Sequence, residues 1–280
     1  MIDTVVIGAG LFGSMIAAEL RRIGQQVITI DRGELFAGSG PAACLIKPSW
    51  LGGMGEHRDS ALEKLNELYT VHELMFSVGA LGLEKKEPVF WVNPTDIMLG
   101  KDMYCDVTRI EPAGRTKTVW CKEQITGEEF EIESLNLVIA AGVWTEQLYP
   151  EFKQKAQWGA ASLWRNEWPS QQPKIRPWAP YKQLVAFDRG DGTWVGDGSA
   201  LLYKNLTSER LADTLRREAE FVGLPMETAT VLQGFRPYAK GHKPCLLESP
   251  DPNVWVASGG AKNGTIAAAH CARVIGEELS

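Results

Sequence analysis

The chain lacks the features of disulfide-rich, zinc-binding and membrane-spanning proteins. Its 280 residues contain only five cysteines, which are scattered, odd in number and without C-x-x-C spacing. No uncharged apolar run approaches the length that crosses a bilayer, and the four histidines show no metal spacing. The first strand begins so close to Met1 that no room is left for a signal peptide. We therefore expect a reduced, cytoplasmic protein without a metal or a membrane contact.

An excess of basic residues is also missing. The formal net charge is −6, which argues against a generally basic nucleic-acid binder. There is no internal repeat, low-complexity tract or long linker. A chain of this length can bury a substantial core, as one large α/β unit or as two intergrown domains.

What the sequence does contain is a glycine-rich turn between two strands, within residues 4–32. A β-branched run at 5–7 stops at Gly8, Gly10 and Gly13, a helical pattern follows, and a second run at 27–30 ends in Asp31. This G-x-G-x-x-G pattern permits a tight turn, close approach of backbone to a pyrophosphate, and close packing of helix on strand. The following acid is placed to bind ribose hydroxyls. The motif predicts a site for an adenine dinucleotide at a helix N-terminus.

Hydrophobic periodicity predicts the remaining elements. We expect a helix over 59–78, strands at 88–92 and 96–99, a meander of two or three antiparallel strands over 103–132, and a buried strand in 135–145 that runs into Ala141 and Gly142. The RGDG turn predicts a hairpin of strands 183–188 and 193–196. Helices are expected over 207–222 and 265–279, and a strand over 254–257. Four tryptophans within 158–178 form either the wall of a pocket or a packed sheet face.

Four motifs together resemble the family of FAD-dependent D-amino-acid, glycine and sarcosine oxidases. Beside the opening motif they are GSGPAACL at 38–45, LVIAAGVWT at 137–145, and GFRPYAKGHKP at 234–244 followed by VWVASGGAKNGTIAAAH at 254–270. The resemblance covers both ends and the middle, roughly half of the chain, and the chain is short for this family.

The resemblance implies an α/β fold, in which a Rossmann-like FAD-binding domain of glutathione-reductase type is intergrown with an α+β substrate domain on an antiparallel sheet. Residues 1–50, 101–150 and 236–280 would form the first domain, and residues 51–100 and 151–235 the second. The residues that it assigns to FAD are Gly8, Gly10, Leu11, Phe12, Gly13, Asp31, Arg32, Ser39, Ala42, Ala43, Cys44, Ala141, Gly142, Trp144, Gly234, Arg236, Gly260, Ala261, Lys262, Asn263, Gly264 and Thr265.

The resemblance also implies an oxidation in which hydride leaves the carbon beside an amine and the resulting imine is hydrolysed. Such a site needs a cation to hold the substrate carboxylate. Arg236 matches the arginine that does this in D-amino-acid oxidases, and Lys262 stands where glycine oxidases have an arginine. Lysine lacks the bidentate fork, so the grip is weaker or the substrate differs. Each residue has a structural alternative: a turn lysine on the surface for Lys262, and an ion pair for Arg236.

Three further residues near these motifs are open. Lys47 follows the flavin loop and either contacts substrate, promotes the reaction with oxygen, or is a solvated lysine. Tyr238 either lines the pocket or lies at the edge of the core. Cys44 is interpreted as a buried thiol rather than a covalent flavin link.

The favoured function is an FAD-dependent oxidase of an α-amino acid or N-substituted glycine, with oxygen as acceptor. A variant places the glycyl group on a modified nucleobase, as in a related tRNA-modifying oxidase and in phage flavin lyases that act on glycine-modified thymidine in DNA, where a base would be flipped into the site. The acidic net charge counts against it. Two alternatives remain: a nicotinamide-dependent dehydrogenase, and a non-catalytic or partner-dependent flavin subunit.

Overall fold

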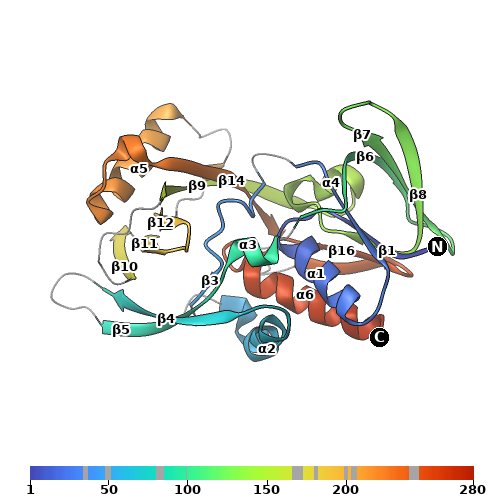
Figure 1. Ribbon diagram of the computed structural model, residues 1–280, viewed down its shortest axis with the longest axis horizontal. Coiled ribbons are helices and arrows are strands. Elements are labelled where there is room, and N and C mark those ends of the chain that lie inside the picture. The colour runs from blue at the N-terminus through green and yellow to red at the C-terminus, as the bar shows by residue number, and fades with distance from the viewer. Residues whose placement is uncertain are drawn as a thin grey trace.

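The computed structural model of the chain describes residues 1–33, 37–47, 52–79, 85–98, 100–165, 173–179, 182–198, 201–202, 207–239 and 246–280. They form two β-sheets that occupy opposite halves of the molecule as seen in Figure 1. Both ends of the chain lie in the half that holds the first sheet. None of the described helices combines the length and apolar character that a membrane-spanning helix needs.

The first sheet combines parallel strands with an antiparallel meander. Its strands are β1 (Ile2–Ile7), β2 (Val27–Asp31), β6 (Met103–Glu111), β7 (Lys117–Glu123), β8 (Glu129–Ile139), β15 (Leu246–Asp251) and β16 (Val254–Ser258). β1 pairs in parallel with β2 and with the second half of β8, which also pairs in parallel with β16. The first half of β8 pairs antiparallel with β7, and β7 with β6. The predicted meander and the predicted buried strand are both confirmed, and β8 belongs to both.

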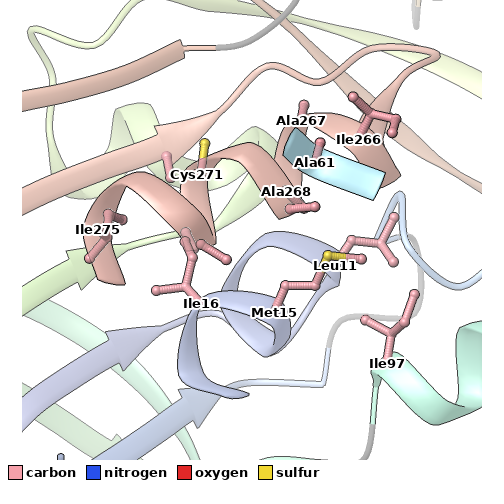
Figure 2. Packing of buried hydrophobic residues seen from close by; sticks show 14 of the residues in the cluster. Leu11, Met15, Ile16, Ala61, Ile97, Ile266, Ala267, Ala268, Cys271 and Ile275 are labelled. Carbon is pink, nitrogen blue, oxygen red and sulfur yellow. The ribbon is translucent and has the colours of Figure 1, made fainter. Parts of the chain in front are cut away.

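Apolar layers cover both faces of the parallel strands, as their β-branched sequences require. On one face lie α1 (Leu11–Arg22), α6 (Gly264–Glu278), α2 (Arg58–Leu68) and α3 (Pro94–Ile97). Figure 2 shows α1 and α6 side by side, and Met15 and Ile16 of α1 belong to the same buried cluster as Cys271 and Ile275 of α6. The other face, with Val5 and its neighbours, packs against the meander. The turn η3 (Gly142–Trp144), with the short helix α4 (Thr145–Leu148), follows β8.

The second sheet is mostly antiparallel. Its strands are β3 (Leu45–Ile46), β4 (Val71–Val78), β5 (Lys85–Val92), β9 (Gln154–Arg165), β10 (Lys174–Ala179), β11 (Lys182–Asp188), β12 (Gly192–Gly196), β13 (Leu201–Leu202) and β14 (Thr230–Ala239). The predicted hairpin is confirmed as β11 and β12. One face packs against α5 (Ser208–Val222). Its N-cap Thr207 accepts a hydrogen bond from the Arg210 N–H at 3.2 Å, and the helix ends at Gly223 with a φ of 73°. The 3₁₀ turns η2 (Gly52–His57) and η5 (Met226–Thr228) complete the described elements.

Two predicted elements are wrong. The helix expected over 59–78 ends at Leu68, and the rest forms β4, paired along its length with β5. In residues 71–78, hydrogen bonding to the neighbouring strand β5 stabilises a strand more than the apolar spacing stabilises a helix. The strand expected at 96–99 is instead the short helix α3, because Asn93 Oδ1 accepts from the Thr95 N–H at 3.1 Å and Pro94 opens the helix. Leu99 lies outside the described residues.

The tryptophan segment is a packed sheet face where the structure describes it. The side chains of Trp158 and Trp164 are buried on β9, while Trp168 and the side chain of Trp178 lie outside the described part. The strands of the first sheet come from 2–31, 103–139 and 246–258, and the division of the chain into two domains stays a prediction.

Candidate cofactor and substrate site

A cavity of about 570 Å³ is lined by residues of both sheets. The carboxyl ends of β1, β2 and β8 reach it at Ile7, Ile30 and Ala140. From the second sheet, Val185 of β11 and Trp194 of β12 line the opposite wall. The carboxyl ends of parallel strands are the place where α/β sheets bind ligands.

The turn from β1 into α1 depends on its glycines. Gly8 has a φ of 102°, and its N–H donates to Ile30 O at 2.7 Å. A Cβ on Gly13 would lie 1.7 Å from the carbonyl oxygen of Gly8, so helix and strand touch through their backbones. Gly10 is the N-cap of α1 and supplies no side-chain cap. The positive end of the helix dipole therefore points at the cavity, as a pyrophosphate site requires.

Asp31 and an arginine–tryptophan pair form one end of the cavity. The Asp31 carboxylate accepts from the Ala9 N–H at 2.7 Å and from the Gly33 N–H at 2.6 Å, which holds it beside the glycine turn. The guanidinium of Arg32 lies 4.5 Å from the centroid of a Trp144 ring, a cation–π contact. A ribose and a flat adenine ring match the polar and apolar groups at this end.

Two indole groups of the second sheet hold the small-residue loop. Trp194 Nε1 donates to Pro41 O at 3.3 Å, and Trp91 Nε1 donates to Ala43 O at 3.1 Å. These bonds tie the loop to the second sheet at two of its carbonyls. The loop thereby forms part of the cavity wall with backbone and small side chains.

Ser39 and Cys44 connect the loop 37–47 to α1 and α6. Ser39 Oγ accepts from the Leu11 N–H, at the start of α1, at 2.9 Å. Burial raises the pKa of the Cys44 thiol to about 12, although a hydrogen bond with Thr265 opposes that rise. The thiol is therefore protonated at neutral pH, which fits the interpretation of Cys44 as a buried thiol.

A second glycine turn precedes α6. A Cβ on Gly260 would lie 2.7 Å from Gly264 Cα, and Gly260 forms a β-bridge with Tyr238. α6 begins at Gly264 without a side-chain cap. Lys262, within this turn, lines the cavity and has an exposed side chain; its Nζ lies 3.8 Å from the position of a Cβ on Gly198. Lys262 is thus a solvent-exposed cation on the cavity lining.

Arg236 supplies a cation on the wall formed by the second sheet. It lies on β14 and lines the cavity. Burial lowers the pKa of its guanidinium, while the neighbouring Tyr238 and Asp197 raise it. Asp197 is fully buried and accepts from Arg217 Nη2 at 2.8 Å. Arg236 is half-buried, and a cation partly withdrawn from water attracts an anion more strongly than one in solvent.

Most of the sequence-predicted residues line this cavity. They are Gly8, Gly10, Leu11, Phe12, Asp31, Arg32, Ser39, Ala42, Ala43, Cys44, Ala141, Gly142, Trp144, Arg236, Gly260, Ala261, Lys262, Asn263, Gly264 and Thr265. Four do not: Gly13, Gly234, Lys47 and Tyr238. Lys47 is buried and its Nζ pairs with Glu87 Oε2 at 2.8 Å, so its interpretation as a solvated lysine is wrong. Burial raises the pKa of Tyr238, which packs against the second glycine turn.

Sequence reasoning missed the residues that β11 and β12 contribute. Gln183, Trp194, Gly196 and Gly198 line the cavity, and a Cβ on Gly196 would lie 2.4 Å from the Trp194 ring. Within the described residues, Gln183 Oε1 is buried without a hydrogen-bond partner. Residues alternate between the two faces of a strand, so Gln183 lies on the same face of β11 as Val185. This alternation could have predicted that both residues line the cavity.

The sequence model of one family, described as FAD dependent oxidoreductase (DAO), matches residues 103–278. No curated protein matches the chain. Among solved structures, an iminodiacetate oxidase from Chelativorans sp. BNC1 is similar, with a TM-score of 0.69, 14% identity, and coverage of 99% of this chain and 95% of that one. For glycine oxidase from Geobacillus kaustophilus the TM-score is 0.66 at 16% identity, and the match covers 98% of this chain and 93% of that one. For L-alpha-glycerophosphate oxidase from Mycoplasma pneumoniae with FAD bound it is 0.70 at 16% identity, with 97% and 93% covered.

These findings agree with the donor groups of the cavity. At such low identity the structural similarity establishes the fold, a Rossmann-like dinucleotide-binding sheet with a second, mostly antiparallel sheet. The family match covers more than half of the chain. Two helix N-termini, those of α1 and α6, meet the cavity at two places, and neither is capped by the side chain of its own N-cap residue, which suits an extended cofactor with a diphosphate. The cofactor is FAD, and the chain belongs to the family of FAD-dependent oxidoreductases.

Proposed function

We propose that the chain oxidises the bond between a carbon and an amine nitrogen in a small amino acid or amine that carries a carboxylate. The observation that carries this proposal is a half-buried cation, Arg236, on the wall of the cavity that the two glycine turns also line. When bound, FAD supplies a two-electron acceptor for the hydride of the substrate. In keeping with their places along the cavity, the first glycine turn would hold the diphosphate and the second the flavin edge.

Arg236 and Lys262 would then orient the substrate. Arg236 would bind the carboxylate through charge-assisted hydrogen bonds and so fix the position of the carbon that loses hydride. Lys262, a solvent-exposed residue of the cavity lining, would add a single flexible charge. No nucleophile is needed for such a reaction. The imine would leave the cavity and react with water, and oxygen is the proposed electron acceptor.

The choice of FAD over a nicotinamide cofactor rests on the family to which the chain belongs. The similar structures include oxidases of glycine and of iminodiacetate, two small amines with carboxylates, which fits this substrate class. We also propose a cytoplasmic location, in keeping with the four described cysteines, which are buried and form no disulfide with one another.

A second candidate is a glycyl group on a modified nucleobase, in tRNA or DNA. The solvent exposure of Lys262 on the cavity lining favours it, because a large substrate could insert only its reacting end. Two observations count against it. Trp158 and Trp164 are buried and so cannot stack on a base, and the chain is acidic overall. We therefore favour the free amine.

An anaerobic titration tests both candidates. Glycine, sarcosine, iminodiacetate and a glycine-bearing nucleoside are added to the FAD-loaded protein, and bleaching of the flavin spectrum is recorded. Reduction by a free amine supports the proposal, and reduction by the nucleoside alone supports the second candidate. If no amine bleaches the flavin, the chain is a non-catalytic or partner-dependent flavin subunit and the proposed function is wrong.

Two variants test the roles of the cations. Arg236→Ala and Lys262→Ala should each raise the KM of the active amine while FAD stays bound. The loss at Arg236 should be the larger, about 1.5–3 kcal/mol of binding free energy, because its bonds are charge-assisted and its side chain is less exposed than that of Lys262. Full activity in both variants would contradict the assignment of the carboxylate site.

A further inference from the structure

Gly159 on β9 lies directly beneath the guanidinium of Arg236. A Cβ built on Gly159 would be 2.5 Å from Arg236 Nη1, 2.6 Å from Cζ and 2.7 Å from Nη2. β9 pairs with β14 so that Arg236 stands opposite Gln157, and Gly159 is its diagonal neighbour. Long side chains reach that diagonal position across an antiparallel pair. The arginine therefore extends across the neighbouring strand and occupies the space that any side chain at position 159 would fill.

The sheet itself gives no reason for glycine at this position. The φ of Gly159 is not positive, so its backbone is open to every L-residue. In register it stands opposite another glycine, Gly234. A glycine in a strand interior removes packing and costs conformational entropy, and it often marks a place where another group approaches closely. At Gly159 the group that approaches is the guanidinium of Arg236.

The face of β9 that carries Gly159 looks toward the cavity. Side chains alternate along a strand, so Gly159 shares its face with Ala161 and Leu163. Those two pack in the same cluster as Val185 and Trp194, which line the cavity. The guanidinium thus packs directly on the backbone of β9 at Gly159, at the cavity wall.

We infer that Gly159 is a positioning residue for the substrate carboxylate, because it sets the depth and direction of the Arg236 guanidinium. This rests on the proposed function, in which Arg236 binds that carboxylate. A methyl group at position 159 would push the guanidinium toward the cavity and away from its place. The displaced atoms are the end of a flexible side chain, so the fold would tolerate the change while the geometry of carboxylate binding would not.

Gly159→Ala tests this inference with a readout that a merely structural role would not move. The KM of the active amine should rise about tenfold or more, kcat at saturation should change by less than about threefold, and FAD content and melting temperature should stay at wild-type values. Acetate serves as a carboxylate probe without an amine, and its Kd, followed by the flavin spectrum, should rise in parallel. Gly55→Ala is the control, since a Cβ at Gly55 meets nothing within 4 Å.

A double-mutant cycle then shows whether the effect passes through Arg236. In an Arg236→Ala background the guanidinium is gone, so adding Gly159→Ala should change neither KM nor the acetate Kd further. If the two losses multiply instead, Gly159 acts independently of Arg236 and the inference is overturned. Should Gly159→Ala fail to fold, the double variant must fold and bind FAD, because the overlap has been removed; failure of both overturns the inference as well.

The result for Arg236→Ala by itself distinguishes a failure of the proposed carboxylate site from a failure of the positioning role of Gly159. If it leaves KM and acetate binding unchanged, the proposed carboxylate site is wrong and the role of Gly159 falls with it. If it weakens both while Gly159→Ala has no effect, the proposed function stands and only the positioning role is overturned.

Discussion

Glu218 on α5 offers a pH-dependent test of the network that supports the substrate wall. Its side chain is fully buried, where Oε1 accepts from the Asp197 N–H at 3.1 Å and Oε2 is hydrogen-bonded to the Ser162 hydroxyl. Burial raises the pKa of Glu218 well above 4.5; the charge of Asp197 raises it further, while Ser162 and Arg217 lower it. Asp197 directly follows β12, and its neighbours Gly196 and Gly198 line the cavity.

The sign of the effect follows from proton binding. Between 4.5, the ordinary value, and its raised folded-state pKa, Glu218 holds more proton in the folded than in the unfolded chain. Its contribution to stability is therefore complete below pH 4.5 and is lost as pH rises through the folded-state pKa. Above the folded-state pKa, the free energy of unfolding is lower by about 1.4 kcal/mol for each unit by which the folded-state pKa exceeds the unfolded-state pKa.

Glu218→Gln should remove this loss. The amide still accepts from the Asp197 N–H and can donate to the Ser162 hydroxyl, but it cannot ionise. We expect the variant to gain stability over the wild type as pH rises, by about 3 °C in melting temperature for each kcal/mol, until the difference levels off above the folded-state pKa.

The assay is thermal unfolding of the FAD-loaded protein from pH 5 to pH 9, with Glu220→Gln as the matched control. Glu220 lies on the same helix and is exposed, so its variant should follow the wild-type curve. The reasoning is refuted if the Glu218→Gln and wild-type melting temperatures run parallel across the whole range.

Three further predictions concern the first glycine turn and the cavity wall. Gly13→Ala should abolish FAD retention, because its Cβ would meet Gly8 O at 1.7 Å; flavin absorbance after gel filtration checks this, and wild-type flavin content would contradict it. Gln183→Met should raise the melting temperature of the substrate-free protein by about 2 °C, since it removes a buried acceptor without a partner among the described residues; a lower melting temperature would show that the amide is satisfied. Trp194→Phe should weaken FAD binding about fivefold by releasing the hydrogen bond to Pro41 O, worth about 1 kcal/mol; flavin fluorescence during dilution measures it, and an unchanged FAD affinity would mean that the loop needs no such tie.

How far the sequence predicted this molecule depended on how local each feature is. The hairpin of β11 and β12 follows from a few adjacent residues, and it was predictable. The helix expected over 59–78 was not, because its second half pairs with β5, and apolar spacing alone does not report a partner strand. The ion pair of Lys47 was not predictable for the same reason, because its partner Glu87 is distant in the chain.

By itself the sequence determined the two glycine turns, the strand that ends at Asp31, and the arginine and lysine near the carboxyl end. Those features depend on short-range backbone geometry and on residue types that leave visible spacing. Only the tertiary structure decided that both turns open into one cavity, that β11 and β12 supply its opposite wall, and that Gly159 lies under Arg236. The physical reason is that strand register joins residues far apart in the chain, and a space left empty for another side chain has no mark in the sequence except a glycine.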